Sequence, residues 1–399
     1  MFDLTVVSAA PEKLVSSKAH KSQLPKNAKL AYCGKHNWLK ELLWAFAFLF
    51  TRTGRQEIAR IWRSGNKKSG RLLHCIRYYT WAQSIRLNMK KAGLFDEIGD
   101  CLYYTFWFSA IFLACALEKS KQPSMNLTSR IHGYDLYNNR APWHWQPMRE
   151  FAINSVDTII FLTQKAKDYF ITAFCEEEPA REKVWDFPVC ALGSKPAKGR
   201  PSKDSDDVFR IVSCSNAIVL KRVELIIEAL AILDDARIEW LHFGDGPKLE
   251  SLKKLALEKG VSANFKGYTP HEDVLDYYGQ NFVDLFITTS STEGLPVSIQ
   301  ESMAYGIPII GTDVGGVSEE IDGNGILLPA NPSAEEVAEA IWDIMRLPAK
   351  EVASMRDRSQ QLWAERFDAR SSLQKMRSLF EAIVGARQKH NPQSKAIHE

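Results

Sequence analysis

Two carboxylates, Glu293 and Glu301, are the first candidates for chemistry, because seven residues separate them and a Gly-Leu-Pro turn follows the first. The apolar, β-prone run 281–289 precedes them and predicts a buried parallel strand. Pro296 is expected at the first helical position, where its missing N–H costs nothing. Glu293 would then lie on a loop, with Glu301 about 7 to 8 Å further along the helix axis, at roughly 1.5 Å per residue.

The helix that begins here is also a candidate anion site. The first backbone N–H groups of a helix, here those of Val297, Ser298 and Ile299, lack helical partners and attract negative charge. The residues expected around the anion are Gly294, Leu295, Pro296, Val297 and Ser298. Because a carboxylate repels phosphate, the two glutamates would hold hydroxyl groups while the amides hold phosphates. That division fits a nucleotide-sugar; the alternative is that the two carboxylates are a loop charge and a solvated helix residue.

The run from about Arg210 to Met345 resembles the donor half of a GT-B glycosyltransferase of the large retaining family numbered four, whose signature is Glu, seven residues, Glu. It is especially similar to members that build bacterial capsular and exopolysaccharides. The resemblance implies an α/β fold of two Rossmann-like, doubly wound domains that face a central cleft. It also implies metal-independent transfer, with a nucleotide-diphosphate sugar as co-substrate and no other cofactor.

The stretch Leu127–Tyr137 resembles the Arg-x-His-Gly-Tyr-Asp motif of the polysaccharide members, at the end of an acceptor-domain strand. The resemblance implies that His132 hydrogen-bonds the donor sugar near the reacting carbon, so His132 and Glu293 are the candidate catalytic residues. Gly133 leaves room for close approach by backbone or ligand. A lone histidine at a strand end is more often structural, so this assignment depends on the motif.

A second phosphate candidate lies in the run Ser213–Arg222. Family members carry an Arg and, five residues later, a Lys, both aimed at the donor diphosphate. Here Asn216 stands in the first position and Lys221 in the second, and Arg222 follows. Asn brings no charge, so phosphate affinity would depend mainly on Lys221, with help from Arg222. The alternative is that these are surface residues that open a helix.

Three weaker signals lie in the same half. Gly244 and Gly246 form a tight turn into a helix. The strand around Phe265 resembles the edge that reads the nucleotide base, and an ordinary short strand fits it equally well. The run 204–206 matches an Asp-x-Asp metal motif, but it lies in a solvated linker, so no metal site is expected.

The length of 399 residues fits two domains. We expect an acceptor-side domain at 1–193, a linker rich in Pro, Lys and Ser at 194–207, and a nucleotide-sugar donor domain at 208–362. A helix at 363–386 is expected to cross back to the first domain, and a polar tail to follow at 387–399. Leu4–Ser8 looks like the second strand of related proteins, so the first βα unit is expected to be missing.

The apolar pattern predicts the remaining elements. In the first domain it indicates a polar loop at 9–29, helices at 38–50, 109–117 and 164–174, and strands at 103–107 and 156–163. In the second domain, strands at 209–214, 238–243, 283–289 and 307–311 alternate with helices from 223, at 247–258, 296–305 and 333–346, and a last helix at 363–384. This alternation predicts a parallel sheet whose ligands bind beyond the carboxyl ends of the strands. A membrane hairpin is the alternative for 102–117.

The net charge of +3 hides an asymmetry. Residues 35–91 contain thirteen Lys and Arg against two acidic residues, Glu41 and Glu57, with four Trp among them. Anionic lipid attracts each such cation by about 1 kcal/mol, so this region is expected to face an anionic membrane. Plain core packing is the alternative for 38–50, whose nine consecutive apolar residues are too few to span a bilayer.

Other partners and compartments are constrained as well. No nucleic-acid recognition motif accompanies the basic charge. The seven cysteines are scattered without metal-ligand spacing, and no signal pattern is visible. These observations indicate a cytoplasmic protein, peripheral on the inner face of the cytoplasmic membrane.

The leading hypothesis is a retaining hexosyltransferase that transfers a sugar from a nucleotide-sugar to a growing, lipid-linked glycan in cell-surface polysaccharide biosynthesis. Lys221, Asn216 and the amides at the helix start would stabilise the charge that develops on the leaving diphosphate. Two alternatives stay open. One is another GT-B enzyme such as an epimerase or phosphorylase. The other is a catalytically impaired protein that binds nucleotide-sugar, suggested by the expected absence of the first βα unit and by Asn216.

Overall fold

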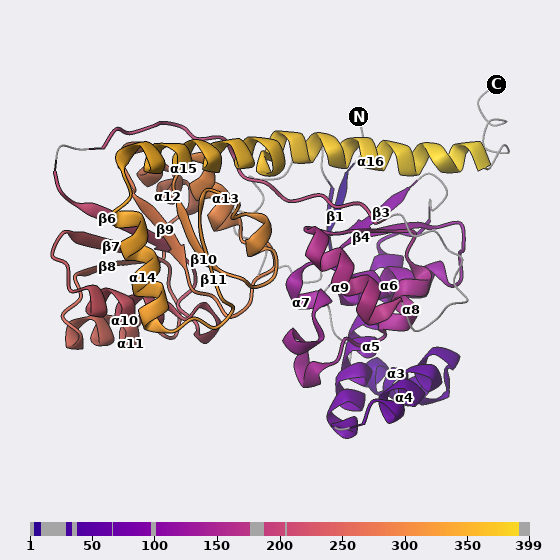
Figure 1. The fold of residues 1–399 in the computed structure, drawn as a ribbon. Helices are drawn as coiled ribbons and strands as arrows, with labels where there is room; N and C mark the ends of the chain where they lie inside the picture. Colours follow the sequence, from indigo (N-terminus) through magenta and orange to yellow (C-terminus); the bar gives the residue numbers. More distant parts are fainter. Residues whose placement is uncertain are drawn as a thin grey trace. The chain divides into compact units, whose positions relative to one another are not determined.

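The computed structural model describes residues 4–8, 29–33, 38–65, 67–96, 101–175, 187–203 and 206–390. The chain forms two compact units, one of residues 1–161 and 167–189, the other of residues 162–166 and 190–399 (Figure 1). Each unit contains parallel β-sheet covered by helices. The expected domain limits, and the crossing of the last helix onto the first domain, stay predictions.

The second unit is built on one sheet of six parallel strands in the order β11-β10-β9-β6-β7-β8. These strands are β6 Phe209–Cys214, β7 Ile238–Phe243, β8 Ala263–Gly267, β9 Leu285–Thr288, β10 Ile309–Thr312 and β11 Gly325–Leu328. The first of them lies at the centre, so the chain winds outward in both directions. The carboxyl ends of β6 and β9, which are far apart in sequence, therefore lie side by side.

Helices cover both faces of this sheet. They are α10 Val223–Leu233, α11 Leu249–Glu258, α12 His271–Gln280, α13 Val297–Ala304, α14 Ala334–Met345 and α15 Ala349–Leu362. The last helix, α16 Ala369–His390, follows them in the chain. Side chains alternate along each strand, so Ile211 packs with α10, α11 and α14 while Val212 packs with α12, α13 and α15. This arrangement confirms the predicted doubly wound α/β architecture.

The first unit contains a three-stranded parallel sheet, β3-β4-β5, and a separate parallel pair, β1-β2. Its strands are β1 Thr5–Ser8, β2 Lys29–Tyr32, β3 Leu102–Thr105, β4 Asn126–Arg130 and β5 Thr158–Ile160. Its helices are α3 Trp38–Phe50, α4 Arg52–Arg63, α5 Lys68–Lys91, α6 Ala110–Lys119, α7 Gly133–Leu136 and α8 Arg149–Ser155, and α9 Gln164–Phe174 follows. The partly buried β3 and the buried α6 confirm a strand and helix at 102–117 instead of a membrane hairpin.

The predicted bounds of α3, α9, β6 and β7 agree with the structure. Pro296 was expected inside its helix and is instead the extended residue before it, so α13 begins at Val297. The single helix expected at 363–384 is interrupted by a π-helical turn, Trp363–Phe367, and by Asp368. Asp368 is extended, and its carboxylate accepts the N–H of Arg370, which caps the start of α16.

Candidate functional site

Two loops meet where β6 and β9 end. After β6 the chain forms a short 3-10 turn, Val219–Lys221, and after β9 it runs over this turn. The backbone N–H of Ser291 donates to the carbonyl of Leu220 at 2.8 Å, and the Thr289 hydroxyl donates to the carbonyl of Arg222 at 2.9 Å. These bonds fix the position of Lys221 relative to the residues that follow β9.

Lys221 and Glu293 form an ion pair as a result. The Lys221 Nζ lies 2.5 Å from the Glu293 Oε1. The Lys221 side chain is 22% exposed and that of Glu293 is 9% exposed, so water reaches mainly the lysine. A cation and a carboxylate in contact at a strand end can separate to bind a phosphate and a hydroxyl group.

The start of α13 lies directly after Glu293. Gly315 adopts a positive φ of 56°, and a Cβ there would lie 2.1 Å from the carbonyl oxygen of Glu293. The next N–H, of Gly316, donates to the carbonyl of Gly294 at 2.7 Å, so the loop after β10 holds this turn in place. Leu295 and Pro296 are buried, while Val297 and Ser298 are partly exposed.

One detail of the expected anion site is wrong. The N–H of Ile299 donates to the carbonyl of Pro296 at 3.1 Å, so it is not available to a ligand. The N–H groups of Val297 and Ser298 have no backbone partner among the described residues. The site at this helix start therefore offers two amides instead of three.

Glu301 lies on the buried side of α13 and is 8% exposed. Its Oε1 is 2.5 Å from the Nε2 of His271, the first residue of α12, and burial raises its pKa above the usual value. Cys214, at the end of β6, has its pKa raised to about 12, by burial and then by the charge of Glu301, whereas Lys221 lowers it. The charges of Glu301 and Lys221 therefore both act on the Cys214 thiol, at the carboxyl edge of the sheet.

His271 was not among the predicted residues. It precedes Glu301 by thirty positions on another helix, and its side chain is 55% exposed. No motif in the sequence singles it out, because its proximity to Glu301 arises only from the packing of α12 beside α13. It holds the carboxylate that is expected to bind ribose.

Arg222 and Asn216 differ in what they contact. The Arg222 guanidinium donates to the carbonyls of Thr289, Ser290 and Ala330 at 2.7 to 2.9 Å and to the Asn331 side chain at 3.1 Å. Four of its five N–H groups thus hold two loops, the one after β9 and the one after β11, which leaves one for the phosphate contact predicted for Arg222. Asn216 is exposed on the loop after β6.

The glycine turn after β7 packs against the loop that carries Asn216. Gly244 has φ of 144°, and a Cβ there would lie 1.8 Å from the carbonyl oxygen of Ser215. Gly246 has φ of 154°, and its Cβ would lie 2.6 Å from the carbonyl oxygen of Ala217. Glycine is required at both positions for the two loops to meet.

Beneath this turn, hydrogen bonds link three side chains, those of His242, Ser213 and Trp240. The Nδ1 of His242 is 2.8 Å from the hydroxyl of Ser213, which also accepts the indole N–H of Trp240 at 3.0 Å. Burial lowers the pKa of His242 to about 4, so the ring is neutral. Phe265 packs against Trp240 and His242 from β8, with ring centroids 5.3 and 5.9 Å away. Its side chain is therefore part of the support under the turn, and base reading would use its backbone.

His132 lies in the first unit, directly after β4, and is 8% exposed. Its ring lies against Trp107 and Phe106, with centroid distances of 4.1 and 4.7 Å. Burial, followed by the charge of Arg130, lowers its pKa to about 4, so the imidazole is neutral. Gly133 is buried and begins α7.

Within the described ranges no cluster of His, Cys, Asp or Glu has the geometry of a metal site, and Asp204 and Ser205 lie outside these ranges. Across the same ranges, no helix has the length and apolar composition needed to cross a bilayer.

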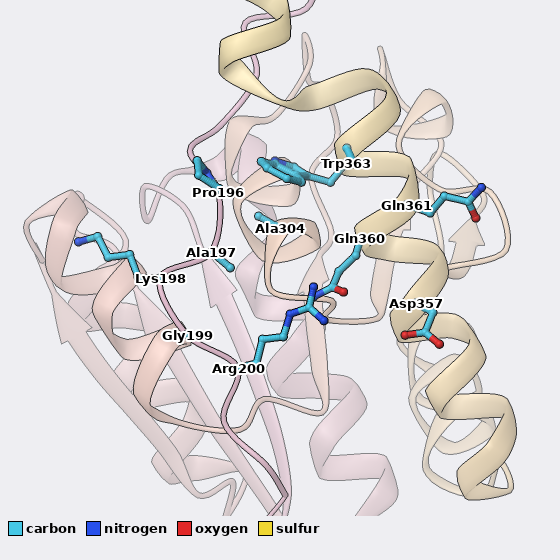
Figure 2. Close-up of a pocket in the computed structure, with 11 residues that line it drawn as sticks. Pro196, Ala197, Lys198, Gly199, Arg200, Ala304, Asp357, Gln360, Gln361 and Trp363 are labelled. Carbon is cyan, nitrogen blue, oxygen red and sulfur yellow. The ribbon is translucent and has the colours of Figure 1, made fainter.

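A groove of about 600 Å³ lies elsewhere on the second unit, between the segment Pro196–Arg200 and α15 with its π-helical turn (Figure 2). None of the predicted site residues lines it. The candidate site therefore stays at the carboxyl edge of the sheet.

Comparison with known proteins identifies related sequences. Residues 197–362 match the family described as Glycosyl transferases group 1. TuaC of Bacillus subtilis (strain 168), whose name refers to teichuronic acid biosynthesis, is 25% identical over 273 residues, which are 65% of this chain and 64% of TuaC. WbnH of Escherichia coli, an O-antigen biosynthesis glycosyltransferase, is 40% identical over 89 residues, which are 22% of this chain and 25% of WbnH. The matches span less than two thirds of each of these relatives.

Among solved structures, Anabaena Alr3699/HepE in complex with UDP-glucose matches with a TM-score of 0.62 at 16% sequence identity. The match covers 95% of this chain and 98% of that protein. A likeness at this identity establishes the fold, which agrees with the parallel sheets of both units. The chain therefore has the GT-B fold of two Rossmann-like domains, and its residues 197–362 are similar to the Glycosyl transferases group 1 family.

Proposed function

We propose that the protein is a retaining hexosyltransferase that transfers a sugar from a nucleotide-sugar to a growing, lipid-linked glycan in cell-surface polysaccharide biosynthesis. The observation that carries this proposal is the pairing of Lys221 with Glu293 beside the start of α13, with Glu301 at the same edge of the sheet. The group 1 domain and relatives named for O-antigen and teichuronic acid biosynthesis support it.

The donor would divide its groups among these residues. Its diphosphate would take the ammonium of Lys221 and the amides of Val297 and Ser298, which are partly exposed at the helix start. Glu293, released from the ion pair, would accept hydroxyl groups of the sugar, and Glu301 those of the ribose. Binding thus exchanges an internal charge pair for two contacts with the substrate, and needs no metal ion.

Transfer breaks the bond between the anomeric carbon and a diphosphate oxygen and forms a bond to the acceptor oxygen. The negative charge that develops on the leaving diphosphate is stabilised by Lys221 and the two amides. The acceptor proton passes to the leaving phosphate, so attack occurs on the same face and the configuration is retained. His132 is neutral, since its pKa is about 4, and would orient the sugar by hydrogen bonding without carrying charge.

Donor hydrolysis without acceptor tests this proposal. UDP-glucose, UDP-N-acetylglucosamine and GDP-mannose are supplied in turn, and release of the nucleoside diphosphate is measured. We expect release by the unmodified protein and its loss in Lys221→Ala and Glu293→Ala, but not in Lys253→Ala, which removes an exposed lysine paired with Glu250. Binding of a donor without any turnover would favour the catalytically impaired alternative, and equal turnover in all variants would refute the assigned site.

A lipid-linked acceptor would bring the protein to a membrane, and α3 has the surface for it. Six large apolar side chains on this helix are between 57% and 69% exposed: Trp38, Leu39, Leu42, Leu43, Phe46 and Phe50. Only Phe48 is fully buried, where it packs on Tyr79 of α5 at a centroid distance of 4.9 Å. The face of α3 opposite Phe48 is thus apolar and exposed.

The charges near α3 favour an anionic surface. Glu57 is 4% exposed and accepts bonds from the indole of Trp145 and the N–H of Met148, while Glu41 accepts the hydroxyl of Ser84. In the described part of 38–91, the exposed charged residues are all basic: Lys40, Arg52, Arg55, Arg63, Lys67, Arg77, Lys90 and Lys91. Each would contribute about 1 kcal/mol near anionic lipid.

Vesicle co-sedimentation tests the membrane contact. We expect binding to phosphatidylglycerol-containing vesicles at low salt, weaker binding to phosphatidylcholine alone, and release by salt. A double substitution on α3, Leu42→Glu with Phe46→Glu, should abolish binding, whereas Leu257→Glu, at an 82% exposed leucine of α11, should not. No binding at low salt, or a dimer that these substitutions dissociate, would refute this contact.

A further inference from the structure

Arg222 is the residue at which the turn after β6 changes direction to begin α10. Its backbone lies in the left-handed region, with φ of 46° and ψ of 40°, which a residue with a Cβ adopts only at a cost in energy. It directly follows Lys221, the cation of the candidate site. A strained backbone beside a site persists only where the surrounding structure fixes it, and here the fixing contacts include those of the arginine's own side chain.

The guanidinium of Arg222 reaches across the carboxyl edge of the sheet. It donates to the carbonyls of Thr289 and Ser290, which follow β9. It also donates to the carbonyl of Ala330 and to the side chain of Asn331, which follow β11. The strand order on this side of the sheet is β11-β10-β9-β6, so one side chain connects the end of the edge strand to the end of the central strand.

The bonds between the loops after β6 and β9 run in both directions. The Thr289 hydroxyl lies 2.9 Å from the carbonyl oxygen of Arg222 and 3.2 Å from that of Lys221. The carbonyl of Ser290 also accepts the hydroxyl of Thr312, in β10, at 2.6 Å. Thr289 and Ser290 are 1% and 0% exposed, so water does not compete for these bonds. The backbone of Lys221 and the loop that leads to the candidate glutamate thus share one set of hydrogen bonds.

This geometry makes Arg222 poorly suited to bind a phosphate. Arginine usually binds phosphate through two parallel N–H groups, either the pair on Nη1 and Nη2 or the pair on Nε and Nη2. Both pairs include Nη2, whose two hydrogens are bonded to Ser290 and Ala330. A bidentate contact with phosphate would therefore break bonds that hold the loops. Lys221 differs, because its ammonium has three N–H groups, of which Glu293 takes one, and its side chain is 22% exposed.

We propose that Arg222 is a positioning residue for donor binding: it connects the loops after β6, β9 and β11 so that Lys221 and Glu293 meet, and it does not itself bind the diphosphate. This inference rests on the proposed function, and it replaces the phosphate contact predicted for Arg222. Asn331, an exposed residue of the loop after β11, contributes to donor binding through Arg222 without touching the donor.

A double-substitution cycle separates positioning from direct contact. UDP serves as the probe, its affinity is measured by calorimetry, and urea unfolding verifies that each variant is folded. We expect Lys221→Met and Arg222→Met each to weaken UDP binding by about tenfold or more. The double variant should bind UDP within about twofold of Lys221→Met alone, because Arg222 acts through Lys221. If Arg222 bound phosphate itself, the two losses would multiply.

Two further variants test the shape of the arginine side chain and its distant partner. Arg222→Lys keeps the charge but cannot bond to both loops, so we expect it to be as weak as Arg222→Met, whereas a phosphate ligand would keep most of its affinity. Asn331→Leu removes one of the four bonds, and we expect it to weaken UDP binding by about threefold. Arg346→Met is the control: it removes an exposed arginine that bonds to Asp343, and it should leave UDP affinity unchanged.

UDP binding and donor hydrolysis are read separately. Losses that multiply in the double variant, near-normal affinity in Arg222→Lys, or unchanged affinity in both Arg222→Met and Asn331→Leu would overturn the inference. A lowered urea midpoint in Arg222→Met with unchanged UDP affinity would overturn it too, because the side chain would then serve stability alone. If the unmodified protein binds UDP and the variants follow the expected pattern, but no donor is hydrolysed, the proposed function is refuted and the positioning role stands.

Discussion

Substitutions can separate what the ion pair between Lys221 and Glu293 contributes to stability from what it contributes to activity. Lys221→Met and Glu293→Gln each remove one charge with little change of shape, and the double variant removes both. At 2.5 Å the attraction is about 7 kcal/mol at an effective dielectric of about 20, but loss of hydration offsets most of it. Hydrogen bonds to charged groups are worth about 1.5–3 kcal/mol net, so we expect a coupling energy of about 2 kcal/mol.

The single variants should differ in stability. Lys221→Met leaves the 9% exposed Glu293 without its partner, and we expect the free energy of unfolding to fall by about 2–3 kcal/mol. Glu293→Gln leaves a lysine that water can reach, so the loss should be about 1–2 kcal/mol. The double variant should lose about 2 kcal/mol less than the sum of the two, as measured from urea midpoints and slopes.

Activity provides the contrast. Donor hydrolysis should be absent in all three variants, because restored stability does not restore the cation for the diphosphate. The same cycle on the exposed pair Lys253 and Glu250 should give a coupling below about 1 kcal/mol and full activity. Additive losses at Lys221 and Glu293, or turnover regained in the double variant, would refute the reasoning.

Three other predictions follow from the same unit. Gly244→Ala should lower the free energy of unfolding by more than about 2 kcal/mol, because the added Cβ would overlap the carbonyl of Ser215. Gly260→Ala is the control: Gly260 has a φ of 70° and open space around it, so the loss should be about 1 kcal/mol. Urea unfolding measures both losses, and equal losses would contradict the packing of the two loops. Burial raises the pKa of Glu320 well above its usual value, so the stability that its protonated form contributes is present at low pH and is lost as pH rises towards the raised pKa. Glu320→Gln should therefore weaken the fall in urea midpoint as the pH rises above the usual carboxyl range, and an unchanged fall would show that this carboxyl does not titrate as described. The raised pKa of Glu301 predicts that donor affinity, measured by calorimetry with UDP, falls as acid protonates the carboxylate, and that Glu301→Gln removes this dependence; a dependence that persists in the variant would assign it elsewhere.

The main features of the donor-side site could be predicted because they depend on strand ends. Apolar runs located β6, β7 and β9, and the carboxyl ends of parallel strands share one edge, so Lys221 and Glu293 were expected to be close. His271 could not be predicted, because it reaches Glu301 only through the packing of α12 beside α13. Its distance along the chain carries no information about that contact.

The long helix α5 of the basic region was also missed, for a physical reason. The buried side of α5 includes Thr80, Gln83 and Ser84, so apolar and polar residues do not separate into two faces. In contrast, α3 was predicted with its observed bounds because it is almost wholly apolar. Most of its apolar side chains are exposed, which argues against the alternative of plain core packing.

The position of β6 at the centre of the second sheet has a consequence for biosynthesis. Its neighbour β9 is made some seventy residues later, after β7 and β8 have been completed on the other side. A growing chain on the ribosome can therefore pair β6 with β7 early, before Glu293, the partner of Lys221, has been synthesised. The candidate site, whose last residue is Glu301, would therefore form only after about three quarters of the 399 residues have been made.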